Sequence, residues 1–227
     1  MSASTLIDKK ILIDVPNGIV KHIKKLGYNT GEIESILITH LHGDHFFDIP
    51  FFMFDRYFQK NDNLVCIYCP KGTKEKVKLL FDIGFPGDFD RINHAINVKF
   101  VEFDGESKIE GKDFVAYSKY VKHGNFEPAY GYIITLNNKK IGFSGDSKFC
   151  NAIENIVEET DISILDMSHA QNVTPAHMGI EDIKYLCNKY KNKTIISTHM
   201  HKYTKEQALS LDIKNFIVGK DNLKISI

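Results

Sequence analysis

The chain has 227 residues, of which 43% are hydrophobic, and it carries 29 Lys and Arg against 29 Asp and Glu. This length and apolar content suffice to bury a sizeable core, which excludes a disordered chain. Zero net charge excludes a strong positive field, so a long polyanion could be held only by local contacts. The ten histidines stand out, because histidine is the commonest metal ligand and packing needs few of them.

The sequence also bears on where the protein acts. Four cysteines are too few for a disulfide framework, and the chain has neither a signal-like start nor a long apolar run. We therefore expect a cytoplasmic protein with reduced thiols and no membrane contact. Because no linker, repeat or low-complexity stretch divides the sequence, we interpret residues 1–227 as a single domain.

The predicted elements begin with two short strands in residues 6–14 around a Lys-Lys turn, followed by a helical stretch that ends at Gly27. An apolar strand at 35–39 precedes an aromatic-rich segment, 46–58, that is expected to begin a helix. Further strands are predicted at 64–68, 98–103, 114–121, 132–136, 140–143, 162–165 and 194–197, and helices at 74–82, 180–190 and 205–211. This pattern indicates an α/β fold of layered α+β type, with two sheets packed on each other and covered by helices.

One short segment concentrates metal-binding side chains. Residues 39–45, Thr-His-Leu-His-Gly-Asp-His, contain His40, His42, Asp44 and His45. In an extended backbone, residues two apart point the same way, so His40 and His42 can share one ion. Gly43 then allows a sharp turn that aims Asp44 and His45 at a second ion. Crowding three imidazoles and a carboxylate at a strand end without an ion would be costly.

Three later residues occupy similar positions. His123, Asp146 and His199 each follow an apolar run, and ligands at strand ends can converge on one rim of a sheet. Each alone is a weak signal, but two ions need more donors than residues 40–45 supply. A mixed imidazole and carboxylate set suits two divalent ions, with Zn²⁺ expected and Mn²⁺ or Fe²⁺ as alternatives.

These residues resemble the metallo-β-lactamase superfamily. The His-x-His-x-Asp-His pattern is intact at residues 40–45, the later His, Asp and His follow in the family order, and residues 11–14 look like the preceding strand with its Asp. The resemblance implies a metallo-β-lactamase-like hydrolase domain over residues 1–227, built as a four-layer αββα sandwich. We expect the family's usual first strand to be missing, because the chain begins near the second strand with Ser2-Ala3-Ser4. The first sheet would then be either one strand short or completed by another chain.

The resemblance also implies how the ions are held. His40, His42 and His123 would bind one metal, Asp44, His45 and His199 the other, and Asp146 would bridge them. Two such ions activate a bridging hydroxide and stabilise both attacking and leaving oxygens, so the implied reaction is hydrolysis.

Other segments are similar to the branch that contains RNase Z and related phosphodiesterases. These segments are residues 67–73, 122–132, 168–170 and 176–179. Residues 168–170 resemble a His-Glu-Ala-Thr loop that lacks its Glu. We assign Asp44, His169 and His177 as candidate catalytic residues. His169 and His177 can supply positive charge or a proton near neutral pH, and His177 is expected at a helix N-terminus that favours an anion. His169 could instead orient Asp44 or a ligand imidazole.

The substrate is expected to be a small, anionic or nucleotide-derived phosphodiester. RNase Z carries a tRNA-gripping arm between the third-motif His and the bridging Asp, whereas His123 and Asp146 are separated only by a strand pair around Asn137-Asn138. With zero net charge, this argues against a long nucleic acid. The alternatives are a carboxylic ester, lactone or thioester hydrolase on the same residues, and a catalytically idle binding module stabilised by metal. We expect the aromatic residues of 46–58 to be core first, with a homodimer interface as the second use.

Overall fold

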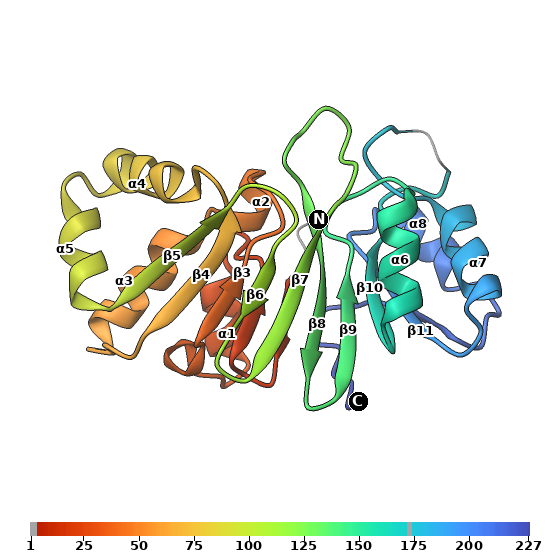
Figure 1. Cartoon of the computed structure of the whole chain (residues 1–227), viewed down its shortest axis with the longest axis horizontal. Helices are drawn as coiled ribbons and strands as arrows, with labels where there is room; N and C mark the ends of the chain where they lie inside the picture. The colour runs from red at the N-terminus through yellow and green to blue at the C-terminus, as the bar shows by residue number, and fades with distance from the viewer. Residues whose placement is uncertain (1–3, 172–173) are drawn as a thin grey trace. The chain divides into compact units, whose positions relative to one another are not determined.

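The structure, a computed structural model, describes residues 4–171 and 174–227. Within these residues the chain forms two compact units, divided between Asp104 and Gly105, and each unit has one sheet with its own helices (Figure 1). Of the chain start considered above, Ser2 and Ala3 lie outside the described residues. A single hydrolase domain over residues 1–227 stays a prediction.

The N-terminal unit contains a five-stranded sheet in the order β1-β2-β3-β4-β5. Its strands are β1 (Thr5–Ile7), β2 (Ile11–Ile13), β3 (Ser35–Leu37), β4 (Val65–Pro70) and β5 (Val98–Phe103). The predicted hairpin is confirmed: β1 and β2 are antiparallel, and Asp8 and Lys9 turn the chain with φ of 46° and 60°. The remaining strand pairs are parallel, so the ends of β2 and β3 lie at the same edge.

The helices of this unit are α1 (Ile19–Lys25), η1 (Thr30–Glu32), α2 (Gly43–Phe46), α3 (Ile49–Phe58), α4 (Thr73–Gly84) and α5 (Asp88–Ala95). The aromatic segment is only partly core. Phe46 and Phe52 are buried among the strand side chains, but Phe47, Phe51 and Phe58 are 48%, 52% and 74% exposed. The core prediction is therefore wrong for these three, because α2 and α3 each turn one face to solvent.

The C-terminal unit contains a seven-stranded sheet in the order β12-β11-β10-β9-β8-β7-β6. Its strands are β6 (Lys108–Glu110), β7 (Phe114–Tyr120), β8 (Tyr130–Leu136), β9 (Lys139–Phe143), β10 (Ile162–Asp166), β11 (Thr194–Thr198) and β12 (Phe216–Val218). Strands β6 to β9 are antiparallel, whereas β9 to β12 are parallel. As predicted, only a tight turn links β8 to β9, with Asn137 and Asn138 at φ of 49° and 63°.

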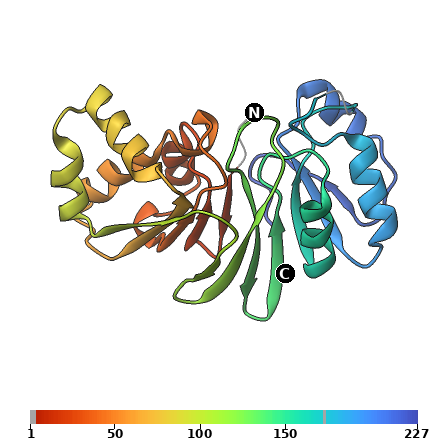
Figure 2. The same cartoon turned by 45° about the horizontal axis from the view of Figure 1, so that its top comes forward.

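The helices of the C-terminal unit are α6 (Asn151–Glu159), α7 (Ile180–Lys189) and α8 (Lys202–Ala208). In Figure 2, α6 runs along one face of the sheet, where it packs on β8, β9 and β10, and α7 packs against β11. Glycines make this approach possible. A Cβ at Gly131 would lie 2.6 Å from both the Phe143 carbonyl oxygen and Ile156 Cδ1.

The sheet edges are short or charged. Strands β1, β6 and β12 each end a sheet and each have three residues. The fourth edge strand, β5, is longer, and it exposes Lys99 and Glu102. Charged or very short edges disfavour pairing with the strand of another chain.

All four cysteines are free thiols, and burial raises the pKa of Cys187 to about 11. Across the described residues, no helix combines the length and the apolar character that crossing a membrane requires.

The close packing of α6 on the sheet predicts a steric effect at Gly131. Because the neighbouring carbonyl oxygen is backbone and cannot rotate away, Gly131→Ala is expected to lower the free energy of unfolding by about 1–3 kcal/mol. Gly84→Ala is the matched control, since no atom lies within 4 Å of its added Cβ. Urea unfolding measures both variants; equal stability of the two would show that Gly131 does not approach the Phe143 carbonyl oxygen of β9 and Ile156 of α6 this closely.

Candidate metal centre

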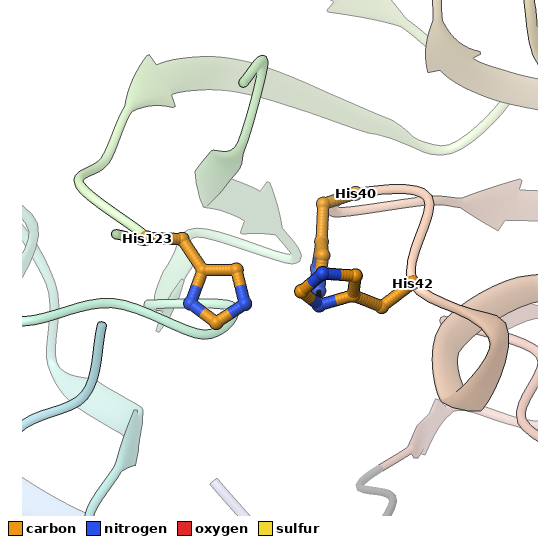
Figure 3. Close-up of side chains that lie close together, drawn as sticks. All are labelled: His40, His42 and His123. Carbon is orange, nitrogen blue, oxygen red and sulfur yellow. Dashed lines mark hydrogen bonds between the residues drawn. The ribbon is translucent and has the colours of Figure 1, made fainter. Parts of the chain in front are cut away.

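The first pair of candidate ligands follows β3. His40 Nε2 and His42 Nδ1 lie 3.0 Å apart (Figure 3), so the two rings turn one nitrogen each toward a common point. Two nitrogens bound at tetrahedral positions of Zn²⁺ are separated by about 3.3 Å. The spacing is thus compatible with the predicted sharing of one ion. The third imidazole drawn in Figure 3, His123, belongs to the C-terminal unit and is described below.

A buried carboxylate, Asp14, orients the neighbouring imidazoles. It follows β2 and accepts hydrogen bonds from the Thr39 N–H, the Thr39 hydroxyl and His45 Nδ1, each at 2.8 Å. Because a carboxylate can only accept, His45 Nδ1 carries the proton and Nε2 is the ring nitrogen left for a metal. The Thr39 oxygen in turn lies 3.0 Å from His40 Nδ1, which directs His40 Nε2 toward His42. Such hydrogen-bonded support is typical of imidazole metal ligands.

Asp44 and His45 lie on the single-turn helix α2, and the Asp44 carboxylate is 3.7 Å from His45 Nε2. The chain does turn at Gly43, but our reason for the glycine was wrong. Gly43 is not among the residues with positive φ; instead, a Cβ there would lie 2.7 Å from the Phe47 ring. Close approach of an aromatic ring, rather than an unusual backbone conformation, explains the glycine.

In the C-terminal unit, His123 follows β7, and its ring, like that of His45, is oriented by a hydrogen bond of Nδ1. His123 Nδ1 lies 3.0 Å from the carbonyl oxygen of Ala176, to which it donates, so Nε2 is the candidate metal-binding atom. The ring is buried and its centroid is 5.0 Å from that of His177.

Four further side chains of this unit converge at the ends of β9, β10 and β11. One potential ligand atom from each of Asp146, Asp166, His177 and His199 lies within 4.8 Å of all the others. His199 is placed between the carboxylates, with Nε2 3.5 Å from Asp146 and Nδ1 3.6 Å from Asp166. His199 has a φ of 58°, a left-handed conformation that is rare outside glycine and is typical of functional sites.

Asp166 is a candidate site residue that we missed in the sequence. Its fully buried carboxylate accepts from His177 Nδ1 at 2.7 Å and from the Ser147 N–H at 3.1 Å. Residues 168–170 lack the Glu of the His-Glu-Ala-Thr loop that they resemble. Asp166, at the end of β10, supplies a carboxylate just before them. The signal was available, because Asp166 ends the apolar run 162–165 just as Asp146 follows its own run.

The structure also corrects the setting of His177. Helix α7 begins at Ile180, and the Gly179 N–H donates to Asp182 at 3.0 Å, so a side chain of the helix itself caps its N-terminus. His177 therefore lies before the helix and acts with Asp166 rather than with the helix dipole.

His169 has imidazole neighbours. Its ring centroid lies 4.9 Å from that of His201 and 5.8 Å from that of His177. Burial lowers the pKa of His169, and the adjacent His201 and His177 lower this pKa further. His169 is thus biased toward the neutral form.

Comparison with known proteins identifies the family. The family model described as Anti-Pycsar protein Apyc1 matches residues 4–220. This chain belongs to the Apyc1 family. It is 28% identical over 135 residues to ribonuclease Z of Pyrococcus horikoshii, a match that spans 59% of this Apyc1-family chain and 41% of that relative. The matched part is less than half of the relative's length.

Solved structures share the fold of the Apyc1-family chain. Human tRNase Z, short form (ELAC1), superposes with a TM-score of 0.73 at 18% identity, covering 99% of this chain and 91% of that chain. A diphosphatase from the PhnP family gives a TM-score of 0.74 at 22% identity, covering 99% and 83%. The metallo-β-lactamase fold protein YhfI from Bacillus subtilis gives a TM-score of 0.71 at 16% identity, covering 92% of this chain and 83% of that chain, so the predicted metallo-β-lactamase fold is confirmed. The resemblance to the RNase Z and phosphodiesterase branch is confirmed as well.

The hydrogen bonds of Asp14 predict a measurable effect on metal binding. Asp14→Ala removes the acceptor that orients His45, so metal affinity is expected to fall by roughly 10- to 100-fold. Titration against a chelating dye measures this affinity, and circular dichroism checks the fold. Asp62→Ala, a change at an exposed carboxylate of the same unit, is the control. Equal affinity of the two variants would contradict the role of Asp14.

Proposed function

We propose that this chain is a metal-dependent hydrolase that cleaves a small, nucleotide-derived phosphodiester. The observation that carries the proposal is the setting of His177, which hydrogen-bonds through Nδ1 to buried Asp166 and stacks on His199 with ring centroids 5.3 Å apart. A departing alkoxide needs a proton, and an imidazole held by a carboxylate is a suitable donor near neutral pH.

We further propose that seven residues bind two divalent ions, Zn²⁺ or alternatively Mn²⁺ or Fe²⁺. They are His40, His42, Asp44, His45, His123, Asp146 and His199. The mixture of imidazole nitrogens and carboxylate oxygens suits these ions. When bound, such ions lower the pKa of water toward neutrality and neutralise charge on phosphoryl oxygens.

In this proposal the proton donor is His177 and not His169. Asp166 fixes the His177 ring with the proton on Nδ1, which leaves Nε2 to hold and release a proton. The carboxylate also stabilises the protonated ring before transfer, which makes Asp166 a positioning residue. His169 has imidazoles as its ring neighbours, so we assign proton donation to His177.

Three observations favour a small phosphodiester as the substrate. The names of the relatives, ribonuclease and diphosphatase, denote enzymes that break phosphorus–oxygen bonds. The chain has no net charge with which to attract a long polyanion. Strands β8 and β9 are joined by the two-residue turn at Asn137 and Asn138, which leaves no room there for an inserted RNA-gripping arm.

The proposal is tested with metal-replete protein on three substrates: bis(p-nitrophenyl) phosphate, a lactone and a thioester. We expect turnover of the phosphodiester alone, with loss of activity after chelation and recovery when metal is restored. Preference for the lactone or thioester would overturn the substrate class. Absence of turnover on all three would overturn the hydrolase and favour a binding module.

The role of His177 predicts a dependence on the leaving group. His177→Gln should lower kcat/KM by roughly 100- to 10,000-fold for a diester with an alkyl alcohol leaving group, but only by about tenfold or less for p-nitrophenolate, which leaves without a proton. Asp166→Asn should show the same pattern, and His94→Gln, a change at an exposed histidine of α5, should have no effect.

Metal analysis of the same variants separates two roles for His177. Unchanged metal content with the leaving-group pattern supports a proton donor. Loss of metal from His177→Gln would show that His177 is a ligand, an arrangement that its proximity to Asp146, Asp166 and His199 permits.

A further inference from the structure

The candidate proton donor belongs to a row of imidazoles that continues away from the candidate ligands. From His199 to His177, from His177 to His169 and from His169 to His201, the ring centroids are 5.3, 5.8 and 4.9 Å apart. Exposure rises along the row: the His199 and His177 side chains are 9% and 17% exposed, His169 is half-buried and His201 is exposed. The row therefore leads from the candidate metal ligands to the surface.

The outer two rings are held together by the backbone. The His201 N–H and the Thr204 hydroxyl both donate to the carbonyl oxygen of Ser168, at 3.2 and 3.0 Å. His169 is itself fixed by a β-bridge to Gly179. Two segments that are distant in sequence are thereby joined beside His169 and His201, so the backbone positions from which the two rings extend are fixed relative to each other.

Such a pair suits an anionic ligand. Each imidazole carries an N–H donor in either protonation state. The two ring centroids lie 4.9 Å apart, a separation that a single phosphate group can span. Lys202 is exposed next to His201 and adds positive charge.

We infer that His169 and His201 form a second anion-binding subsite, which takes a phosphate group carried by the leaving alcohol of the substrate. The inference rests on the proposed function, because the position of the subsite is set by His177. If His177 protonates the leaving oxygen, His169 and His201, which follow His177 in the row, would contact the rest of the leaving alcohol. The substrate class is then a phosphodiester whose leaving alcohol bears a further phosphate.

The test compares two non-hydrolysable probes in metal-replete protein by calorimetry: methylphosphonate and propane-1,3-bisphosphonate. Wild-type protein should bind the bisphosphonate at least about tenfold more tightly, since a charge-assisted hydrogen bond is of this strength. His169→Gln and His201→Gln should each remove most of this preference and leave methylphosphonate binding unchanged. His201→Lys, which keeps a donor, should retain the preference.

His94→Gln is the control, and thermal unfolding of each variant checks folding. A preference that survives both His169→Gln and His201→Gln would overturn the subsite and would assign the second phosphonate to the metal ions. Failure of wild-type protein to bind methylphosphonate would count against the proposed function instead. Because binding is measured without turnover, the two failures are distinguishable.

Discussion

The buried carboxylate of Asp166, which accepts a hydrogen bond from His177, is the constraint on which the arrangement at the ends of β9, β10 and β11 depends. The same carboxylate accepts the Ser147 N–H and lies 3.6 Å from His199 Nδ1. One side chain at the end of β10 therefore sets the direction of a candidate proton donor and faces a candidate ligand. Leaving such a buried acceptor without its partner costs about 1–3 kcal/mol, so the arrangement is strongly specified.

The N-terminal unit uses the same device. Asp14, at the end of β2, accepts from Thr39 and His45 as Asp166 accepts from Ser147 and His177. Asp14 also has a left-handed backbone, with a φ of 57°. In each unit an Asp at the end of a strand accepts a hydrogen bond from an imidazole Nδ1, so Nε2 of that ring is the nitrogen that can bind a metal or exchange a proton. Ring orientation is thus determined within each unit by the fold itself.

The sequence predicted the strands that apolar runs mark, and it missed short elements and contacts that depend on the direction of side chains. The apolar runs of β3, β7 and β11 were predictable, and so was the position of His40, His123 and His199 after them, because strand ends are natural sites for ligands. Strands β6 and β12 have too few residues for alternation to be visible, and α6 follows Cys150, which gives no capping signal. Asp166 was missed because pairing with His177 depends on side-chain directions that spacing does not fix.

The sheet edges have a consequence for behaviour in solution. A chain with no net charge lacks the long-range repulsion that keeps copies of most proteins apart. Pairing between the sheet edges of two copies must then be limited by the edges themselves. Three-residue strands such as β1 and β12 offer few unpaired backbone groups to a neighbouring copy. In this protein, resistance to edge-to-edge pairing of two copies therefore depends on where the sheets end and not on net charge.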